Sequence, residues 1–128
     1  MPAAPAAIFA VRTAAADRIL ASRVRTARSL WARFRGLMGR AGLEDGEGLW
    51  FPGDSSIHMF FMRFPIDAVF LAAAGEAGTW RVVGLREGLR PWRDLAWERG
   101  ADGCLELAAG AARAAGVGPG DLVHFGPP

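Results

Sequence analysis

The ionisable side chains most able to do chemistry lie in and near one apolar stretch, residues 56–71. His58, Arg63 and Asp67 are the ionisable members of this run, and Glu106 lies in a second apolar run further along the chain. An arginine beside an acid can bind a small ligand that carries a carboxylate, a phosphate or several hydroxyl groups. Our first hypothesis is a binding module whose concave polar site is formed by Arg63, Asp67, Glu106 and His58.

The same residues also allow a purely structural interpretation. Arg63 and Asp67 flank Pro65, which bends the run because proline cannot donate to a strand ladder. Charges among apolar residues must be paired or exposed, so the two side chains are expected to bond each other or nearby backbone and hold the bend. Buried charges are more often paired structural groups than ligand sites, so the sequence favours this clamp.

An enzyme is the second hypothesis. Asp67 or Glu106 would act as the general base of a hydrolase or isomerase. Ser55 and Ser56 complete the residue types of a catalytic triad, but they follow Pro52 and Gly53 and are more typical of a turn. Such residue types occur in most domains, so the sequence does not favour an enzyme.

A protein-interaction domain is the third hypothesis. Residues 88–100 are expected to form a loop that carries Pro91, Trp92 and Trp97. Large aromatic side chains on an exposed loop often anchor a partner protein. Convergence of the four polar candidates at one cavity would favour a small ligand, and their dispersal would favour this third hypothesis.

No cofactor and no metal site is expected. The chain has no lysine, which excludes a Walker-type phosphate loop, and its two histidines and one cysteine lack the spacing of a zinc site. A soft copper site would have to combine side chains from three segments: His58, Met59, Met62, Cys104 and His124. Packing in the core is the favoured interpretation of these residues.

The elements that must position these residues are mostly strands. Alternating or apolar β-prone runs predict strands at residues 8–11, 19–26, 48–51, 57–62, 66–71, 79–85, 104–107 and 122–125. Helices are expected only near residues 28–38 and 108–115. This order predicts a mainly β fold, a small sandwich or partly closed barrel of about seven short strands with two short helices. The expected core includes Leu37, Phe60, Ile66, Phe70, Val83, Leu105 and Val123.

Length and charge set the remaining expectations. The 128 residues predict a single domain, with a frayed terminus at residues 1–6. The net charge is +2, and residues 1–40 carry eight of the fifteen arginines but one acid. We expect no specific nucleic acid and no membrane as partners, and the oligomeric state stays open. A single cysteine excludes an intrachain disulfide, which fits a cytoplasmic protein.

Four segments resemble a known family. The run from His58 to Leu71 resembles the central motif of domain of unknown function family 192, and residues 33–40, 104–110 and 116–123 resemble three further motifs of that family in the expected order. The resemblance spans about residues 20–125. It implies a small bacterial or archaeal β-rich domain with no established activity, so no catalytic role is implied for any residue.

Overall fold

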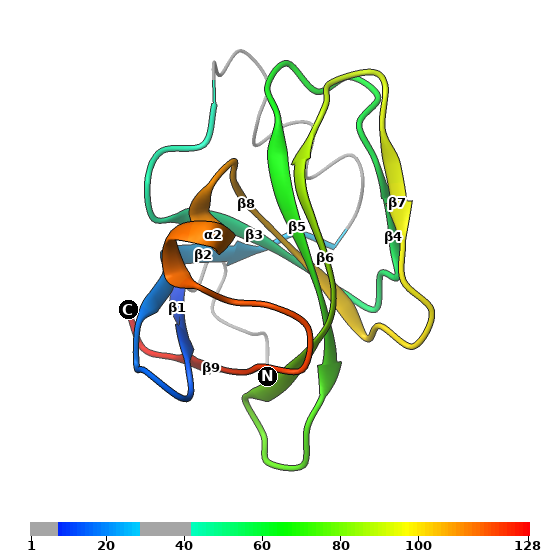
Figure 1. The fold of residues 1–128 in the computed structure, drawn as a ribbon. Helices are drawn as coiled ribbons and strands as arrows, with labels where there is room; N and C mark the ends of the chain where they lie inside the picture. The colour runs from blue at the N-terminus through cyan, green and yellow to red at the C-terminus, as the bar shows by residue number, and fades with distance from the viewer. Residues whose placement is uncertain (1–7, 29–41) are drawn as a thin grey trace.

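Nine strands and one short helix form the part of the chain that the computed structural model describes, residues 8–28 and 42–128 (Figure 1). The elements in chain order are β1 (Phe9–Thr13), β2 (Ile19–Thr26), β3 (Glu47–Pro52), β4 (Ser56–His58), β5 (Ile66–Ala73), β6 (Thr79–Leu89), β7 (Leu95–Trp97), β8 (Gly103–Ala108), α2 (Ala111–Ala115) and β9 (Leu122–Gly126).

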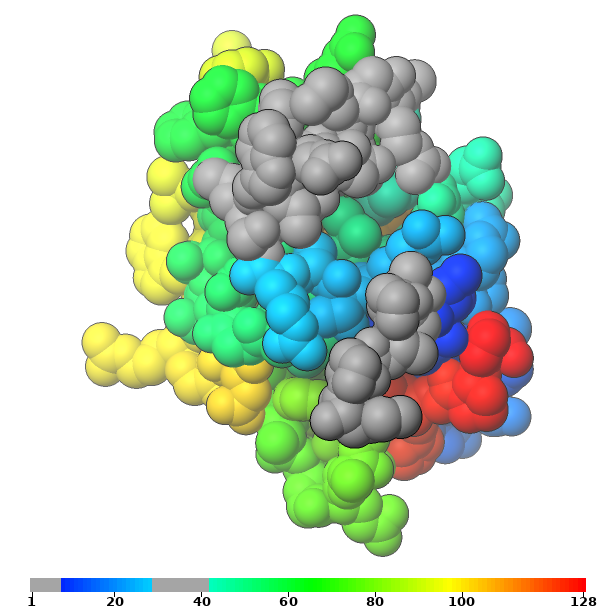
Figure 2. All heavy atoms as spheres, turned by 180° about the vertical axis from the view of Figure 1, so that it is seen from behind, coloured from blue at the N-terminus to red at the C-terminus, as the bar shows by residue number. Residues whose placement is uncertain are grey.

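Seven strands close into a barrel in the order β1-β2-β3-β8-β5-β6-β9, and β9 pairs with β1 to complete it. The neighbours are antiparallel except β2 and β3, which are parallel. Figure 2 shows the first strand, in blue, beside the last strand, in red. The expectation of a mainly β fold with about seven strands is confirmed, and the barrel is fully closed rather than partly open.

Strand β5 is buried on both of its faces. Asp67, Val69 and Leu71 face the barrel interior, where Val69 and Leu71 belong to the first of two hydrophobic cores, the interior core. Ile66, Ala68 and Phe70 face outward into a second core. Because successive side chains of a strand point to opposite faces, burial on both faces accounts for the unbroken apolar run that marks this segment in the sequence.

The second core lies between the barrel wall and a separate two-stranded sheet made of β4 and β7 (Figure 1). Ile57 and Ala96 are cross-strand partners in this small sheet, and both are buried against Phe70 and its neighbours. Burial of these inner side chains fixes the register of the small sheet, and the outer side chains of β4 and β7 therefore face away from the protein.

Two predicted segments differ from the structure. The strand expected at residues 57–62 ends at His58, because Met59 donates its N–H to the Asp94 carbonyl at 3.0 Å and the chain then turns. The loop expected at residues 88–100 is partly strand: β6 continues to Leu89 and β7 pairs with β4. The turn also explains why Phe60, predicted as core, is 47% exposed.

The other core predictions agree with the structure where it describes them. Ile66, Phe70, Leu105 and Val123 are fully buried, and Val83 is partly buried against the second core. The helix expected near residues 108–115 is α2. The helix expected near residues 28–38, Leu37 and the terminus at residues 1–6 fall outside the described residues. Within the described ranges, no helix is long and apolar enough to cross a bilayer.

Replacing Phe70 with alanine tests the second core. Phe70 has no exposed surface, so Phe70→Ala is expected to lower the free energy of unfolding by about 3–5 kcal/mol. Phe60→Ala is the matched control, and because Phe60 is exposed it should cost less than about 0.5 kcal/mol. Urea denaturation of both variants measures the difference, and equal costs would contradict the assignment of the two faces.

Candidate functional site

Asp67 is a structural anchor for three backbone segments. Its Oδ1 accepts a hydrogen bond from the Gly88 N–H at 2.9 Å, and its Oδ2 accepts from the N–H groups of Gly110 at 3.0 Å and Ala112 at 3.2 Å. The side chain has no exposed surface. A buried carboxylate needs such donors to offset its lost hydration, and here the donors include the first turn of α2, which has no side-chain cap from its own N-cap residue.

Glu106 is also fully buried, but it lies on the other face of the same sheet. The β5–β8 register pairs Asp67 with Leu107 and Ala68 with Glu106. Leu107 belongs to the interior core, and Ala68 belongs to the second core. The barrel wall therefore separates the two carboxylates, which cannot act together on one substrate. A general base must come within hydrogen-bond reach of the substrate, and neither carboxylate is open to solvent.

Arg63 does not contact Asp67. The side chain of Arg63 is exposed between the buried residues Met62 and Phe64, and it makes no ion pair with any residue in the described ranges. Of the two expected arrangements, a bond between Arg63 and Asp67 is therefore wrong, whereas bonding to backbone holds for Asp67. Asp67 is satisfied by backbone N–H groups, while Arg63 avoids the cost of burial by pointing into solvent.

His58 lies on the outer face of β4 and is half-buried. Its Nδ1 accepts the Phe60 N–H at 3.3 Å, and its ring centroid lies 5.0 Å from that of Phe60. The four candidates thus occupy three places: Asp67 lies beneath the helix, Glu106 lies in the second core, and His58 and Arg63 lie at the end of β4 and in the surface segment that follows it. The structure does not gather them at one cavity.

Large apolar side chains gather instead on the outer side of the small sheet. Among the described residues, six large hydrophobic side chains are exposed, and five of them lie here, Ile19 being the exception. We call this region, together with the adjoining histidine, the aromatic surface, and define it as His58, Phe60, Phe61, Trp92, Leu95 and Trp97. Exposed apolar side chains that gather on neighbouring segments mark a binding surface more often than scattered single residues do.

Ring contacts and strand pairing connect members of the aromatic surface. His58 and Leu95 are cross-strand partners, and Trp97 lies two residues beyond Leu95 on the same face of β7. Phe61 and Trp92 meet edge to face with ring centroids 5.0 Å apart. The turns that carry them, after β4 and after β6, lie at the same end of the molecule, at the top of Figure 1.

Phe61 and Trp92 both adopt a backbone conformation that bulky residues rarely take. Their φ angles are 67° and 64°, in the left-handed region. Such a conformation costs about 1–3 kcal/mol per residue and persists only where the surroundings enforce it. The Trp92 N–H donates to the Met59 carbonyl at 2.8 Å, which ties the two turns together. The backbone conformations that present these two exposed rings therefore lower the free energy of unfolding of the domain.

An ion pair closes the turn that presents Trp92. The Asp94 carboxylate accepts hydrogen bonds from the backbone N–H of Arg90 at 2.7 Å and from its guanidinium at 3.0 and 3.1 Å. The Arg90 side-chain and backbone hydrogen bonds, with the charges of Arg90 and Arg93, lower the pKa of Asp94 below its ordinary value of 3.8. The same pair raises the pKa of Arg90.

The charge around the aromatic surface is positive. Residues 56–63 and 89–97 contain three arginines and one acid, Asp94, which Arg90 already holds. Arg63 and Arg93 are exposed and make no ion pair within the described part of the chain. Arg86, unlike these two arginines, is paired. Its guanidinium forms an ion pair with Glu98 and donates a hydrogen bond to the Trp97 carbonyl, which holds the backbone of Trp97 in place.

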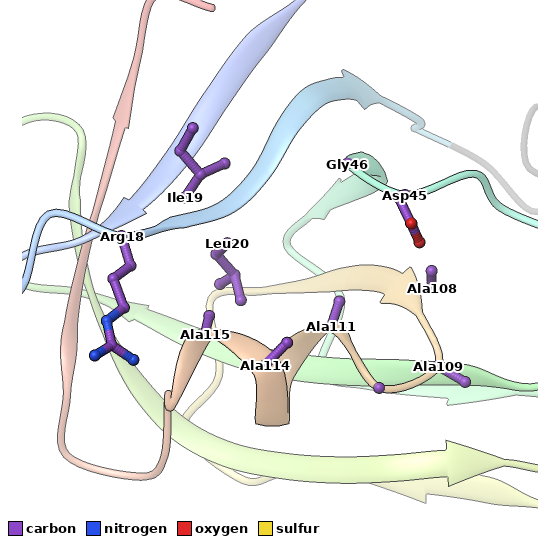
Figure 3. A pocket seen from close by; sticks show the side chains of 11 residues that line it. Arg18, Ile19, Leu20, Asp45, Gly46, Ala108, Ala109, Ala111, Ala114 and Ala115 are labelled. Carbon is purple, nitrogen blue, oxygen red and sulfur yellow. The ribbon is translucent and has the colours of Figure 1, made fainter.

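A shallow hollow lies elsewhere, beside α2 (Figure 3). It has a volume of about 490 Å³, and Arg18 and Asp45 stand at its opposite ends. Alanine and glycine form most of its lining, which is Arg18, Ile19, Leu20, Asp45, Gly46, Ala108, Ala109, Gly110, Ala111, Ala114 and Ala115. None of the four polar candidates contributes to it, and it offers few groups that could orient a polar ligand.

The residues considered for copper also separate. Met59, Met62 and Cys104 belong to the second core, whereas the His124 Nδ1 lies 3.0 Å from the Thr79 hydroxyl on the barrel. No cluster of three or more His, Cys, Asp and Glu side chains suited to a metal occurs in residues 8–28 and 42–128.

Sequence reasoning missed three members of the aromatic surface. Trp92 and Trp97 were expected as exposed anchors, and both are exposed, at 57% and 64%. Phe60 and Phe61 were not expected to be exposed, because a continuous apolar run suggests buried residues when the turn within it is not recognised. Leu95 lies in the segment that was expected to be a loop and was not singled out. For Leu95 the available signal is Pro91 with Asp94, residue types typical of a turn.

Replacing Asp67 tests its role as an anchor. Asp67→Asn places an amide N–H group toward backbone N–H donors and should lower the free energy of unfolding by about 1–3 kcal/mol. Asp54→Asn is the control and should be neutral, because Asp54 is exposed and its side chain makes no hydrogen bond or ion pair among the described residues. Thermal melting compares them. An unchanged melting temperature for Asp67→Asn would show that the anchor is dispensable.

Acid should loosen the turn that presents Trp92. The pKa of Asp94 is depressed in the folded state. The stability that its carboxylate gives to the turn is therefore complete above pH 3.8 and is lost as the pH falls through the lower folded pKa. Amide exchange at Trp92, corrected for intrinsic rates, should therefore accelerate in that window. Asp94→Asn should exchange faster at neutral pH and show no such pH response; a wild-type profile in that variant would contradict the role of Asp94.

Comparison with known proteins places this fold in one family. The model of family DUF192, described as "Uncharacterized ACR", matches residues 11–125. A "UPF0127 protein" of Thermococcus sibiricus is 34% identical over 97 residues, which are 73% of this chain and 59% of the relative. The chain thus spans less than two thirds of the length of that relative.

Two solved structures share the fold across nearly their whole length. A candidate transcription regulator of Sinorhizobium meliloti 1021 superposes with a TM-score of 0.75 at 26% identity, covering 97% of this chain and 98% of the other. A protein of unknown function from Novosphingobium aromaticivorans gives 0.71 at 26% identity, covering 95% and 93%. The chain belongs to the uncharacterised family DUF192, as its four motifs indicated.

Proposed function

We propose that this protein is a non-catalytic binding module that docks a macromolecular partner on its aromatic surface. One observation carries the proposal: five of the six large hydrophobic side chains exposed among the described residues gather there. Binding hot spots are enriched in tryptophan and arginine, and this surface combines Trp92 and Trp97 with the exposed Arg63.

The alternatives have less support. A small polar or anionic ligand bound by His58, Arg63, Asp67 and Glu106 would need these side chains at one cavity, and they lie in three places. A hydrolase or isomerase would need Asp67 or Glu106 to meet a substrate, and both are shielded. One structural neighbour is described as a candidate transcription regulator, a class of protein that works through macromolecular partners.

Strain supports the same conclusion. Phe61 and Trp92 are held in unfavourable backbone conformations by the Met59 carbonyl and the Arg90–Asp94 pair. Stability alone would favour small or polar residues at such exposed positions. Strain that presents exposed rings is typical of a site kept for contact with a partner.

Site-specific photo-crosslinking in the native cells tests the proposal. A benzoylphenylalanine in place of Trp97 should give a slower-migrating adduct, and the same group in place of Ile19 should not. Ile19 is the matched control because it is 50% exposed but lies outside the aromatic surface. The adduct should disappear when Trp92→Ala is added. Equal crosslinking at the two positions, or none at Trp97, would overturn the binding module.

A further inference from the structure

We infer that the partner of the aromatic surface is single-stranded nucleic acid, bound with little sequence preference. This inference rests on the proposed function and names the chemical class of its partner. Three observations support it: the flat rings that dominate the surface, the charge that surrounds them, and the way the backbone presents them.

The composition of the aromatic surface points to bases. Five of its six members carry flat rings, and only Leu95 does not. An apolar protein surface or a bilayer can be met equally well by aliphatic side chains, whereas a base gains specifically from a ring on which it can stack. Stacking tolerates any sequence because every base has a π-face. The partner must be single-stranded, because a duplex covers its base faces with neighbouring pairs.

The charge of the surface suits a phosphate backbone. Arg63 follows Phe61 by two residues, and Arg93 follows Trp92 directly. Both are exposed, and the one acid of these segments, Asp94, is neutralised by hydrogen bonds from Arg90. The contacting rings of Phe61 and Trp92 therefore have two exposed guanidinium groups close by in the sequence, and rings beside free cations are the combination that single-strand binding surfaces use.

The rings are also spread over a surface that a strand could follow. Trp97 and Leu95 lie along β7, His58 lies across from Leu95, and Phe60 contacts His58. Phe61 and Trp92 continue the surface at the turns, where the Trp92–Met59 hydrogen bond joins the two segments. Both segments are thus held in place before a partner arrives, which lowers the entropic cost of binding.

Fluorescence anisotropy with the purified full chain tests the inference. Labelled oligothymidylate and oligouridylate of about twelve nucleotides, within the usual site size, should bind at low salt with a dissociation constant on the order of micromolar. The two arms distinguish DNA from RNA. A duplex of equal length should bind at least about tenfold more weakly. Equal affinity for the duplex would show general charge attraction and overturn the inference.

Two pairs of variants separate stacking from charge. Trp92→Ala with Trp97→Ala should weaken binding of the single strand by at least about tenfold, with an unchanged melting temperature because both rings are exposed. Arg63→Gln with Arg93→Gln should reduce the slope of log affinity against log salt by about 1.4, at about 0.7 per lost phosphate contact. Arg25→Gln with Arg28→Gln removes the same charge from two exposed positions in and just after β2 and is the matched control.

Each remaining outcome decides the matter. Loss of binding in the Arg25/Arg28 control and not in the Arg63/Arg93 pair would overturn the inference. So would binding to vesicles of phosphatidylglycerol and phosphatidylcholine, or to an acidic peptide, without binding to single strands. Nuclease treatment of the Trp97 crosslink should release the adduct. An adduct that resists nuclease would refute this inference and leave the binding module intact, whereas the absence of any adduct would refute the binding module itself.

Discussion

The buried carboxylate of Asp67 connects three parts of the structure that are far apart in the sequence. It accepts N–H groups from residues 21, 43 and 45 positions away, which lie in β6, in the turn after β8 and in α2. Without it, the buried amide of Ala112 in the first turn of α2 would lose this acceptor, a costly state for a backbone group. The carboxylate thus fixes the end of the barrel on which α2 rests.

Strand β5, which carries Asp67, also supports the outer layer of the molecule. Its inward side chains fill the barrel, and its outward side chains, Phe70 above all, form the base of the second core. The small sheet of β4 and β7 has only three residues in each strand, too few to be stable alone. Burial of Ile57 and Ala96 against the barrel wall is what keeps that sheet, and the rings on its outer face, in place.

The stable part of the domain and its strained backbone lie in different places. The closed barrel leaves no free edge among its seven strands, and its interior holds the larger of the two hydrophobic clusters formed by the described residues. The left-handed turns at Phe61 and Trp92 lie outside the barrel, where the hydrogen bond to Met59 and the Arg90–Asp94 pair hold them. A surface for a partner can therefore vary without disturbing the core that supports it.

Local pattern in the sequence determined much of the fold. The strand at residues 19–26 has the predicted bounds, and the last strand, expected at residues 122–125, lies at Leu122–Gly126. The family membership also followed from the sequence, because its motifs are long and ordered. These features depend on short-range preferences of the backbone, which neighbouring residues alone can express.

Only the tertiary structure decided which side chains meet. A shift of one residue moves a strand side chain to the other face of a sheet, so Asp67 and Glu106, although both buried, lie on opposite sides of the barrel wall. The donors to Asp67 and the joining of Phe61 to Trp92 depend on contacts between distant segments. The sequence does not distinguish an apolar residue of the core from one on the surface. The aromatic surface could therefore be identified only from the tertiary structure, which shows that these rings lie outside the packed cores.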